Sequence, residues 1–299
     1  MAKEIVLALG GGGVRGCAHI GTYRYLLDHG YKIKGIAGSS AGGMFGAAFA
    51  AGVDLDEIED AVIKFFKHPD FSRRWNDAAF GGTGHLETAL SPLIGDKNIE
   101  DFPIPFIATA VSITTGEQVT ITKGNALKAV LATIAIPGVF PSQYVEENIL
   151  VDGAILDPVP VELARQFDST LPVVAVPLHY RPRDFRPDQI WLPFSDYLPE
   201  AVFKVVVNTR FGDIMRAMNT SMELVAARLA QLSLEETKPD VIVKPIVGQY
   251  GSLEPINPEK LIAEGYRAME ECLPKLKSSY SIMNSFLRIT KYGGLKKSV

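Results

Sequence analysis

Cysteine is scarce in this sequence. Cys17 and Cys272 are the two cysteines among 299 residues, too few and too far apart for a disulfide framework, as is typical of proteins in a reducing cytoplasm. The sequence also lacks an uninterrupted apolar run of about 18 residues, the length that spans a bilayer. Its opening residues, MAKEIVLALG, lack the basic region and the cleavage site of a signal peptide. We therefore expect a cytoplasmic protein that meets a membrane only at its periphery.

A strong excess of charge of either sign is missing as well. The 30 Lys and Arg residues against 34 Asp and Glu residues give a formal net charge of −4, which offers no global attraction to nucleic acid. No nucleic-acid partner is therefore expected. We expect residues 276–299 to form a basic C-terminal tail, which stays solvated, docks at an interface or packs as a last helix. The last 25 residues hold basic side chains and no acidic one: Lys275, Lys277, Arg288, Lys291, Lys296 and Lys297.

Internal repeats and low-complexity tracts are absent, and 47% of the residues are apolar, which excludes disordered and collagen-like classes. Apolar runs of strand length alternate instead with longer segments of helical period. This α/β pattern predicts βαβ units and a mainly parallel sheet covered on both faces. The expected strands are 4–9, 33–37, 106–111, 149–151, 173–177 and 241–244. The expected helices are 15–29, 40–51, 55–67, 86–94, 125–132, 159–166, 201–234 and 258–273.

Two other segments have patterns of their own. Residues 111–122 alternate around a Thr-Thr-Gly turn and predict a hairpin. Residues 178–200 carry four prolines with several aromatics and no clean period. They predict a long surface loop, which serves either as a plain connector or as a lid over a substrate entrance.

The glycine-rich stretch ALGGGGVRGC, residues 8–17, follows the first expected strand. Its glycines satisfy the dinucleotide-binding pattern G-x-G-x-x-G, but the acidic ribose-binding residue expected about 20 positions later is absent. The second strand ends in Ser39 and Ser40 instead. The G-K-[ST] ending of a phosphate-binding P-loop is absent too. Both nucleotide-binding interpretations therefore fail.

The second strand leads into Gly38-Ser39-Ser40-Ala41-Gly42, a G-x-S-x-G sequence before a helix of small residues. In a strand-to-helix elbow the central serine is exposed and strained, and the flanking glycines avoid backbone clashes. We therefore expect Ser40, rather than Ser39, to be a nucleophile; the alternative is a turn in which serine caps the helix. Because adjacent parallel strands bring the first loop beside the second, the amides of Gly10–Gly13 are the expected oxyanion hole.

A serine nucleophile needs a base, and two candidates follow it. Asp152 stands at the end of an apolar strand, where a desolvated carboxylate can take the serine proton directly. His179 is the one credible histidine for a triad, at the start of the proline-rich loop. Asp152 is preferred, because an α/β-hydrolase normally has more strands before its elbow. Arg15 either fixes the glycine loop, binds an anionic group of a substrate or forms a surface ion pair.

Taken together, these residues resemble the patatin-like phospholipase family, whose motifs are G-G-G-x-[KR]-G, G-x-S-x-G and D-G-[GA] in that order. The resemblance covers residues 4–170 well, and residues 241–273 are similar to bacterial members of the neuropathy-target-esterase branch. It departs at Thr133, where many relatives have serine, and at Ala154, which stands in for glycine. The matching positions are Gly11, Gly12, Gly13, Arg15, Gly16, Gly38, Ser40, Gly42, Asp152 and Gly153.

The resemblance implies a three-layer α/β/α fold with a single domain over residues 1–275, in which 178–240 form a variable lid or helical insert. It also implies hydrolysis of fatty acyl esters by a Ser40–Asp152 dyad through an acyl-enzyme, with the Gly11–Gly13 amides as oxyanion hole and with no metal or cofactor. The expected substrates are phospholipid or lysophospholipid acyl esters. The alternatives are a soluble carboxylesterase for small esters and a non-catalytic lipid-binding module. The methionines within 201–230 either line an acyl groove or pack in the core.

Overall fold

The computed structural model describes residues 3–67, 84–179, 210–252, 254 and 256–293. Residues 180–209, which hold most of the expected loop 178–200 and the start of the expected helix 201–234, lie outside these ranges. In the described ranges, no helix combines the length and the apolar character needed to cross a membrane.

The central sheet has eight strands in the order β5-β6-β3-β2-β1-β7-β8, with β4 paired to β3. The five strands β2, β1, β7, β8 and the first part of β3 run parallel, as the alternating pattern predicts. The antiparallel strands extend the sheet beyond β3, and the predicted hairpin of residues 111–122 is confirmed as the β3–β4 pair. The strand bounds are β1 Lys3–Leu9, β2 Tyr31–Ser39, β3 Phe106–Ser112, β4 Glu117–Ile121, β5 Gln143–Val145, β6 Asn148–Asp152, β7 Val173–Val176 and β8 Val241–Ile242.

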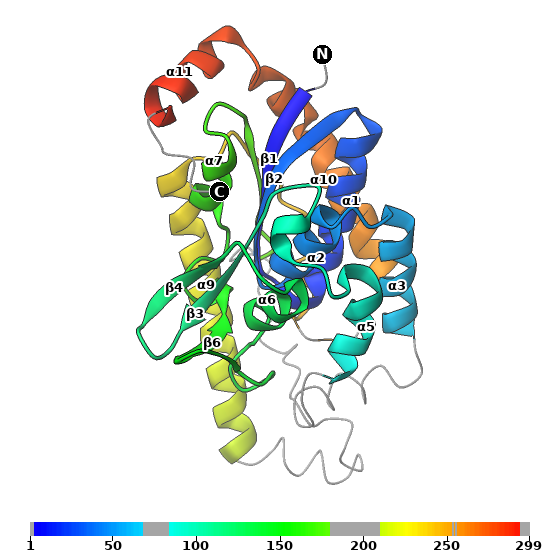
Figure 1. Cartoon of the computed structure of the whole chain (residues 1–299), viewed down its shortest axis with the longest axis vertical. Coiled ribbons are helices and arrows are strands. Elements are labelled where there is room, and N and C mark those ends of the chain that lie inside the picture. The colour runs from blue at the N-terminus through cyan, green and yellow to red at the C-terminus, as the bar shows by residue number, and fades with distance from the viewer. Residues whose placement is uncertain (1–2, 68–83, 180–209, 253, 255, 294–299) are drawn as a thin grey trace.

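Helices cover both faces of the sheet, which gives the three-layer arrangement seen in Figure 1. The α-helices are α1 Cys17–Asp28, α2 Ala41–Ala50, α3 Leu55–Lys67, α5 Gly84–Ile94, α6 Ala126–Thr133, α7 Val161–Phe167, α9 Arg210–Thr237, α10 Pro258–Ser278 and α11 Ile282–Tyr292. Three short 3₁₀ turns among the described residues are η1 Gly13–Gly16, η2 Ile99–Asp101 and η3 Gly153–Ile155. The expected fold class is thereby confirmed.

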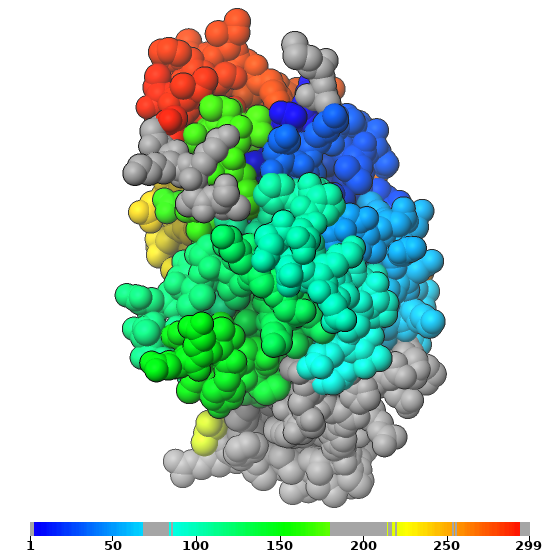
Figure 2. Space-filling view, in the orientation of Figure 1, coloured from blue at the N-terminus to red at the C-terminus, as the bar shows by residue number. Residues whose placement is uncertain are grey.

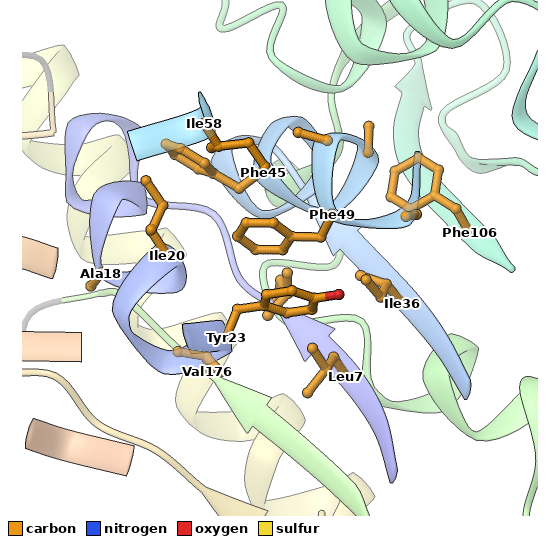
Figure 3. Packing of buried hydrophobic residues seen from close by; sticks show 14 of the residues in the cluster. Leu7, Ala18, Ile20, Tyr23, Ile36, Phe45, Phe49, Ile58, Phe106 and Val176 are labelled. Carbon is orange, nitrogen blue, oxygen red and sulfur yellow. The ribbon is translucent and has the colours of Figure 1, made fainter. Parts of the chain in front are cut away.

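The alternation of side chains along β1 divides the core into two layers. Ile5, Leu7 and Leu9 point into the larger cluster, which α1, α2 and α10 cover. Val6 and Ala8 point the other way, into a smaller cluster under α7 and α9. Figure 3 shows the larger cluster, in which aromatic side chains of α1 and α2 stack above the strands. Burial on both faces explains why these strands are continuous apolar runs.

The basic C-terminal segment contains a helix that packs against the sheet edge. In α11, Arg288 is buried and its Nε donates to Asp240 Oδ1 at 3.0 Å. Tyr280, just before α11, donates its hydroxyl to the carbonyl of Glu4 at 2.8 Å. Ser281 caps the helix by accepting from the amide of Asn284. These contacts attach residues 280–292 to the N-terminal ends of the strands.

Candidate active site

Ser40 occupies a sharp turn between the end of β2 and the start of α2. Its φ of 53° and ψ of −124° are unusual for a residue with a side chain, and such strain persists only where the surroundings enforce it. The flanking glycines are required by contact: a Cβ on Gly38 would lie 2.3 Å from the Gly42 carbonyl oxygen, and one on Gly42 would lie 2.0 Å from that of Leu9. The geometry is that of the elbow predicted from the sequence.

Strand register brings Asp152 beside this turn. Ser39 pairs with Thr109 of β3, and Asp152 pairs with the next residue, Ala110. As a result the Ser40 hydroxyl donates to Asp152 Oδ2 at 2.5 Å. The other carboxylate oxygen accepts from the amide of Ala154 at 2.8 Å. Two residues that lie 112 positions apart in the sequence thus form one hydrogen-bonded pair.

Burial changes the acidity of this carboxyl group. Asp152 is 4% exposed, and desolvation raises its pKa from 3.8 to about 7, although the hydrogen bonds from Ser40 and Ala154 act in the opposite direction. A carboxylate with a pKa near neutrality can accept a proton and return it at the same pH. A pair with this geometry can act as a nucleophile and its base.

Thr133 supports the elbow from α6. The backbone amide of Ser40 donates to Thr133 Oγ1 at 2.9 Å. Thr133 stands where many members of the family described above have serine. Because both residues carry a hydroxyl group, threonine preserves this contact. This support was not predicted, because nothing in the local sequence shows that residue 133 reaches residue 40.

The glycine loop lies against the same turn. A Cβ on Gly11 would lie 3.1 Å from the Cβ of Ser40. The Gly11 amide donates to the Pro158 carbonyl at 3.0 Å, whereas the amides of Gly12 and Gly13 have no backbone partner among the described residues. Gly13 has a φ of +58°, and a Cβ there would lie 1.9 Å from the Ser252 carbonyl oxygen. This loop can therefore present two unpaired amides toward a bound anion.

Arg15 braces the glycine loop from within. It is 2% exposed, and its Nε donates to the Gly12 carbonyl at 3.2 Å. Its Nη2 contacts both carboxylate oxygens of Glu223 on α9 at 2.8 Å. Because the Gly12 carbonyl and the Gly13 amide belong to one planar peptide, the contact that holds the carbonyl also fixes the direction of the amide. Of the roles open to Arg15, the structure favours the fixing of this loop.

Glu223 has no counterpart in the motifs and could not be found from the sequence. Burial raises its pKa, but the positive charge of Arg15 and a hydrogen bond from Ser252 outweigh burial and hold the pKa below its ordinary value. It is therefore an ionised partner for Arg15. The helical segment 210–237 contains several acidic residues, and nothing in the sequence distinguishes Glu223 from the others.

His179 lies near the site without joining it. Its ring nitrogens have no hydrogen-bond partner in the described part of the chain, so it contacts neither Ser40 nor Asp152 in the manner of a triad. Burial and the nearby charge of Arg15 lower its pKa to about 4. His19, by contrast, braces the loop, with Nε2 at 2.8 Å from the Gly10 carbonyl oxygen.

Two cavities meet at Ser40. One is an apolar pocket of about 100 Å³ between α2, α3, α5 and the segment that follows α6. The other, of about 360 Å³, lies under α9 and is lined by Asp152, Arg15 and His179 together with Met218 and Met222. Gly13 and Ile136 line both cavities, as does Ser40. A substrate bound across Ser40 would therefore extend into an apolar pocket on one side and, on the other, into a cavity that also holds charged groups.

Acidic, histidine and cysteine side chains form no cluster of three suited to a metal ion within the described residues.

Comparison with known proteins places these features in a family. The family model described as "Patatin-like phospholipase" matches residues 7–165, which contain the glycine loop, the elbow and Asp152. The matched region covers more than half of the 299 residues.

Individual relatives match with partial coverage. An uncharacterised NTE family protein of Mycobacterium tuberculosis is 39% identical over 165 residues, 54% of this chain and 45% of that protein. Lysophospholipase NTE1 of Pyricularia oryzae is 28% identical over 291 residues, 92% of this chain and 19% of that protein. The chain thus spans less than half the length of these relatives. The crystal structure of VipD from Legionella pneumophila shares the fold, with a TM-score of 0.50, 14% identity and coverage of 93% of this chain and 67% of VipD.

Proposed function

Because the chain belongs to the patatin-like phospholipase family, we propose that it hydrolyses fatty acyl esters of lipids through an acyl-enzyme on Ser40. The observation that carries the proposal is the 2.5 Å hydrogen bond from the strained Ser40 hydroxyl to buried Asp152. The presence of lysophospholipases among the relatives supports a phospholipase A or lysophospholipase type of substrate.

In the first half of the reaction, Asp152 takes the hydroxyl proton as Ser40 Oγ attacks the ester carbonyl. The carbonyl oxygen becomes an oxyanion, which the amides of Gly12 and Gly13 stabilise. The Gly11 amide has a lesser part than the sequence predicts, because it is already paired with Pro158. The tetrahedral intermediate collapses, the bond to the alcohol breaks, and protonated Asp152 gives its proton to the leaving oxygen.

In the second half, water replaces the alcohol beside Asp152. The carboxylate takes one proton from the water as its oxygen attacks the acyl carbon of the ester on Ser40. Collapse of the second intermediate releases the fatty acid, and the proton on Asp152 returns to Ser40 Oγ. A pKa near 7 suits both directions of transfer.

The two cavities give the substrate an orientation. The apolar pocket, lined by side chains such as Phe45, Phe65 and Leu90, suits the acyl chain. The cavity beside Asp152 then takes the alcohol, which must receive its proton from that carboxyl group. Peripheral contact with a membrane fits such a substrate, and we propose no nucleic-acid partner.

The test is a lipid panel followed by mass spectrometry of the released fatty acids. Release of fatty acid from lysophospholipid or phospholipid supports the proposal, and cleavage of small soluble esters alone would favour a carboxylesterase. A fluorophosphonate, which forms an adduct with an activated serine, separates an enzyme from a lipid-binding module. No adduct on Ser40 would contradict the proposal.

The acyl pocket predicts a change of chain-length preference for Ala89→Phe on α5. The added ring would fill part of the pocket that Ala89 lines. Because each buried methylene contributes about 0.8 kcal/mol, we expect kcat/KM for long-chain p-nitrophenyl esters to fall at least about tenfold, while the acetyl ester is unaffected. Thr88→Phe adds the same ring at an exposed position of α5 and serves as control. Equal losses on short and long esters would place the acyl chain elsewhere.

The Arg15–Glu223 pair predicts a loss of turnover for Glu223→Gln. The substitution keeps the volume but removes the charge that holds Arg15, so the Gly13 amide is less well fixed. We expect kcat to fall about ten- to a hundredfold with little change in KM, which is less than the 10²- to 10³-fold typical of deleting an oxyanion-hole donor. A trifluoromethyl ketone, which mimics the tetrahedral intermediate, should bind more weakly by a similar factor.

The control for this prediction is Glu236→Gln, the same change at an exposed position of α9. It should leave kcat and inhibitor binding unchanged. Glu223→Asp should recover part of the lost kcat, because it restores the charge. A fall in thermal stability of Glu223→Gln without any change in kcat would show that Glu223 acts on the fold and not on the loop.

A further inference from the structure

A third cavity, of about 330 Å³, lies between α7, α10, α11 and the segment that follows α9. Five cationic side chains and one carboxylate line it: Arg165, Lys238, Lys275, Arg288, Lys291 and Asp240. The chain as a whole has a formal net charge of −4. A concave site that concentrates positive charge on an acidic protein attracts anions strongly.

Arg165 gives this cavity a buried donor without a partner. The side chain is 3% exposed, and its Nη2 donates to the carbonyl of Lys238 at 2.8 Å. Its guanidinium lies 3.9 Å from the centre of the Tyr292 ring. Its Nε and Nη1 have no hydrogen-bond partner among the described residues, and Nη1 is 3.8 Å from Asp240. Buried polar groups are normally paired, so these donors indicate a missing acceptor.

The single carboxylate is already engaged by another cation. Asp240 accepts from Arg288 Nε at 3.0 Å and from the Val173 amide at 2.9 Å. The other nitrogens of Arg288 donate to the carbonyls of Thr170 and Ser279. Arg288 is therefore satisfied. Arg165 shares the same carboxylate at the longer distance of 3.8 Å. Among the described residues that line the cavity, one carboxylate thus faces five cations, which leaves an excess of positive charge.

Exposed apolar side chains follow one face of α11 beside the cavity. They are Ile282, Met283, Phe286, Leu287 and Ile289, with 91, 67, 62, 54 and 50% of their surface exposed. Spacings of three and four residues place them on one side of the helix, while Arg288 and Tyr292 contact the protein. Leu287 also lines the cavity. Figure 2 shows this helix, in red, at the outer end of the molecule.

We propose that the cationic cavity and the apolar face of α11 form a docking site for the phosphate-bearing headgroup of an anionic lipid at a bilayer surface. Apolar side chains that enter the acyl boundary, flanked by lysines at the headgroups, are the pattern of an interfacial helix. A second copy of the chain would bring like charges together, because residues 272–299 contain six basic residues and no acidic one.

The docking site lies at the end of the sheet opposite to Ser40. Residues in and beside α11 contact Glu4, at the N-terminal end of β1, and Thr170, just before β7. Ser40 follows the C-terminal end of β2, which runs parallel to β1. Docking therefore tethers the protein and leaves the catalytic cavity free, so hydrolysis of a soluble ester does not depend on it.

Vesicle sedimentation of the full chain tests the proposal. We expect binding to phosphatidylcholine vesicles that contain phosphatidylglycerol, no binding to phosphatidylcholine alone, and weakening by salt. Lys291→Glu and Phe286→Ser should each lower the partition coefficient about tenfold or more. The controls make the same changes at exposed positions elsewhere, Lys64→Glu on α3 and Tyr144→Ser on β5, and should bind as the parent does.

Several results would overturn the proposal. Equal binding to both vesicle types or equal loss in the controls would do so. Stabilisation by inorganic phosphate without vesicle binding would indicate a site for free phosphate, and a dimer that Phe286→Ser dissociates, again without vesicle binding, would indicate self-association. The Lys291→Glu variant should cleave a soluble p-nitrophenyl ester at the parent rate. A failure of the catalytic proposal would appear separately, because the parent chain itself would then be inactive on this ester.

Discussion

Ser40→Ala should lower hydrolysis of a p-nitrophenyl acyl ester by roughly 10⁴-fold or more, because the reaction loses the atom that carries the acyl group. The loss should appear in kcat, since every other residue that lines the two proposed ester-binding cavities is unchanged. The fluorophosphonate adduct should disappear with it. The measurement is the initial rate with purified protein, beside thermal unfolding to show that the fold is retained. Relief of the positive φ at residue 40 is not part of the change, because alanine has a Cβ as well.

Ser39→Ala is the matched control for this prediction. Ser39 is adjacent, fully buried and at the end of β2, and its hydroxyl has no hydrogen-bond partner in the part of the chain that the structure describes. Its removal should change the rate only slightly. If both variants lost activity equally, or if Ser40→Ala kept the parent rate, Ser40 would not be the nucleophile.

The sequence could predict those parts of the site that local backbone geometry determines. Gly38 and Gly42 indicate a tight turn in which a side chain at either position would clash with the backbone. Such a turn implies a strained residue at its centre. The strands that are buried on both faces could be predicted equally well, because they are continuous apolar runs. The largely exposed β5 was not predicted. The order of the motifs then indicated Asp152, at the end of a later apolar strand, as the base.

The rest of the site depends on contacts between distant segments. Glu223 reaches Arg15 across 208 positions, and Thr133 reaches Ser40 across 93. Neither residue belongs to a sequence motif that predicts its contact, so the two contacts are seen only in the packing of α9 and α6. The same holds for the Gly11 amide: its pairing with Pro158 comes from a loop contact, which a glycine count cannot show.

Asp152 should make activity depend on pH near neutrality. The carboxylate must be ionised to accept the Ser40 proton, and its pKa in the folded protein is about 7. We therefore expect kcat/KM to fall about tenfold for each pH unit below this value and to level off above it. An unperturbed carboxyl base would instead keep the rate constant down to about pH 4. A flat profile between pH 5 and pH 8 would contradict the assignment.

The same raised pKa predicts that Asp152 lowers stability where it is ionised. A group whose pKa is higher in the folded state, about 7, than in the unfolded state, near 3.8, stabilises the fold below the lower value. That contribution is lost as pH rises from about 4 to about 7. The whole change corresponds to roughly 4 kcal/mol at most. The proposed catalytic base therefore costs stability at neutral pH, and an asparagine at this position would avoid that cost.

Asp152→Asn should therefore be nearly inactive and yet more stable than the parent at pH 8. Its oxygen can still accept from the Ala154 amide, and the Ser40 hydroxyl can rotate to accept from its NH₂. We expect kcat to fall at least about 10³-fold, and urea unfolding to show an advantage that grows by about 3 kcal/mol between pH 5 and pH 8.

Asp157→Asn separates the two effects, because burial also raises the pKa of Asp157, to about 6, without any contact to Ser40. This variant should gain stability with rising pH but keep full activity. Asp152→Asn would contradict the proposed dyad if it stayed active, because no other described carboxylate hydrogen-bonds to Ser40. A loss of stability that is the same at both pH values would instead mean that Asp152 holds the elbow together. Loss of activity with a pH-dependent gain in stability requires that the charge of Asp152 serves the reaction and opposes the fold.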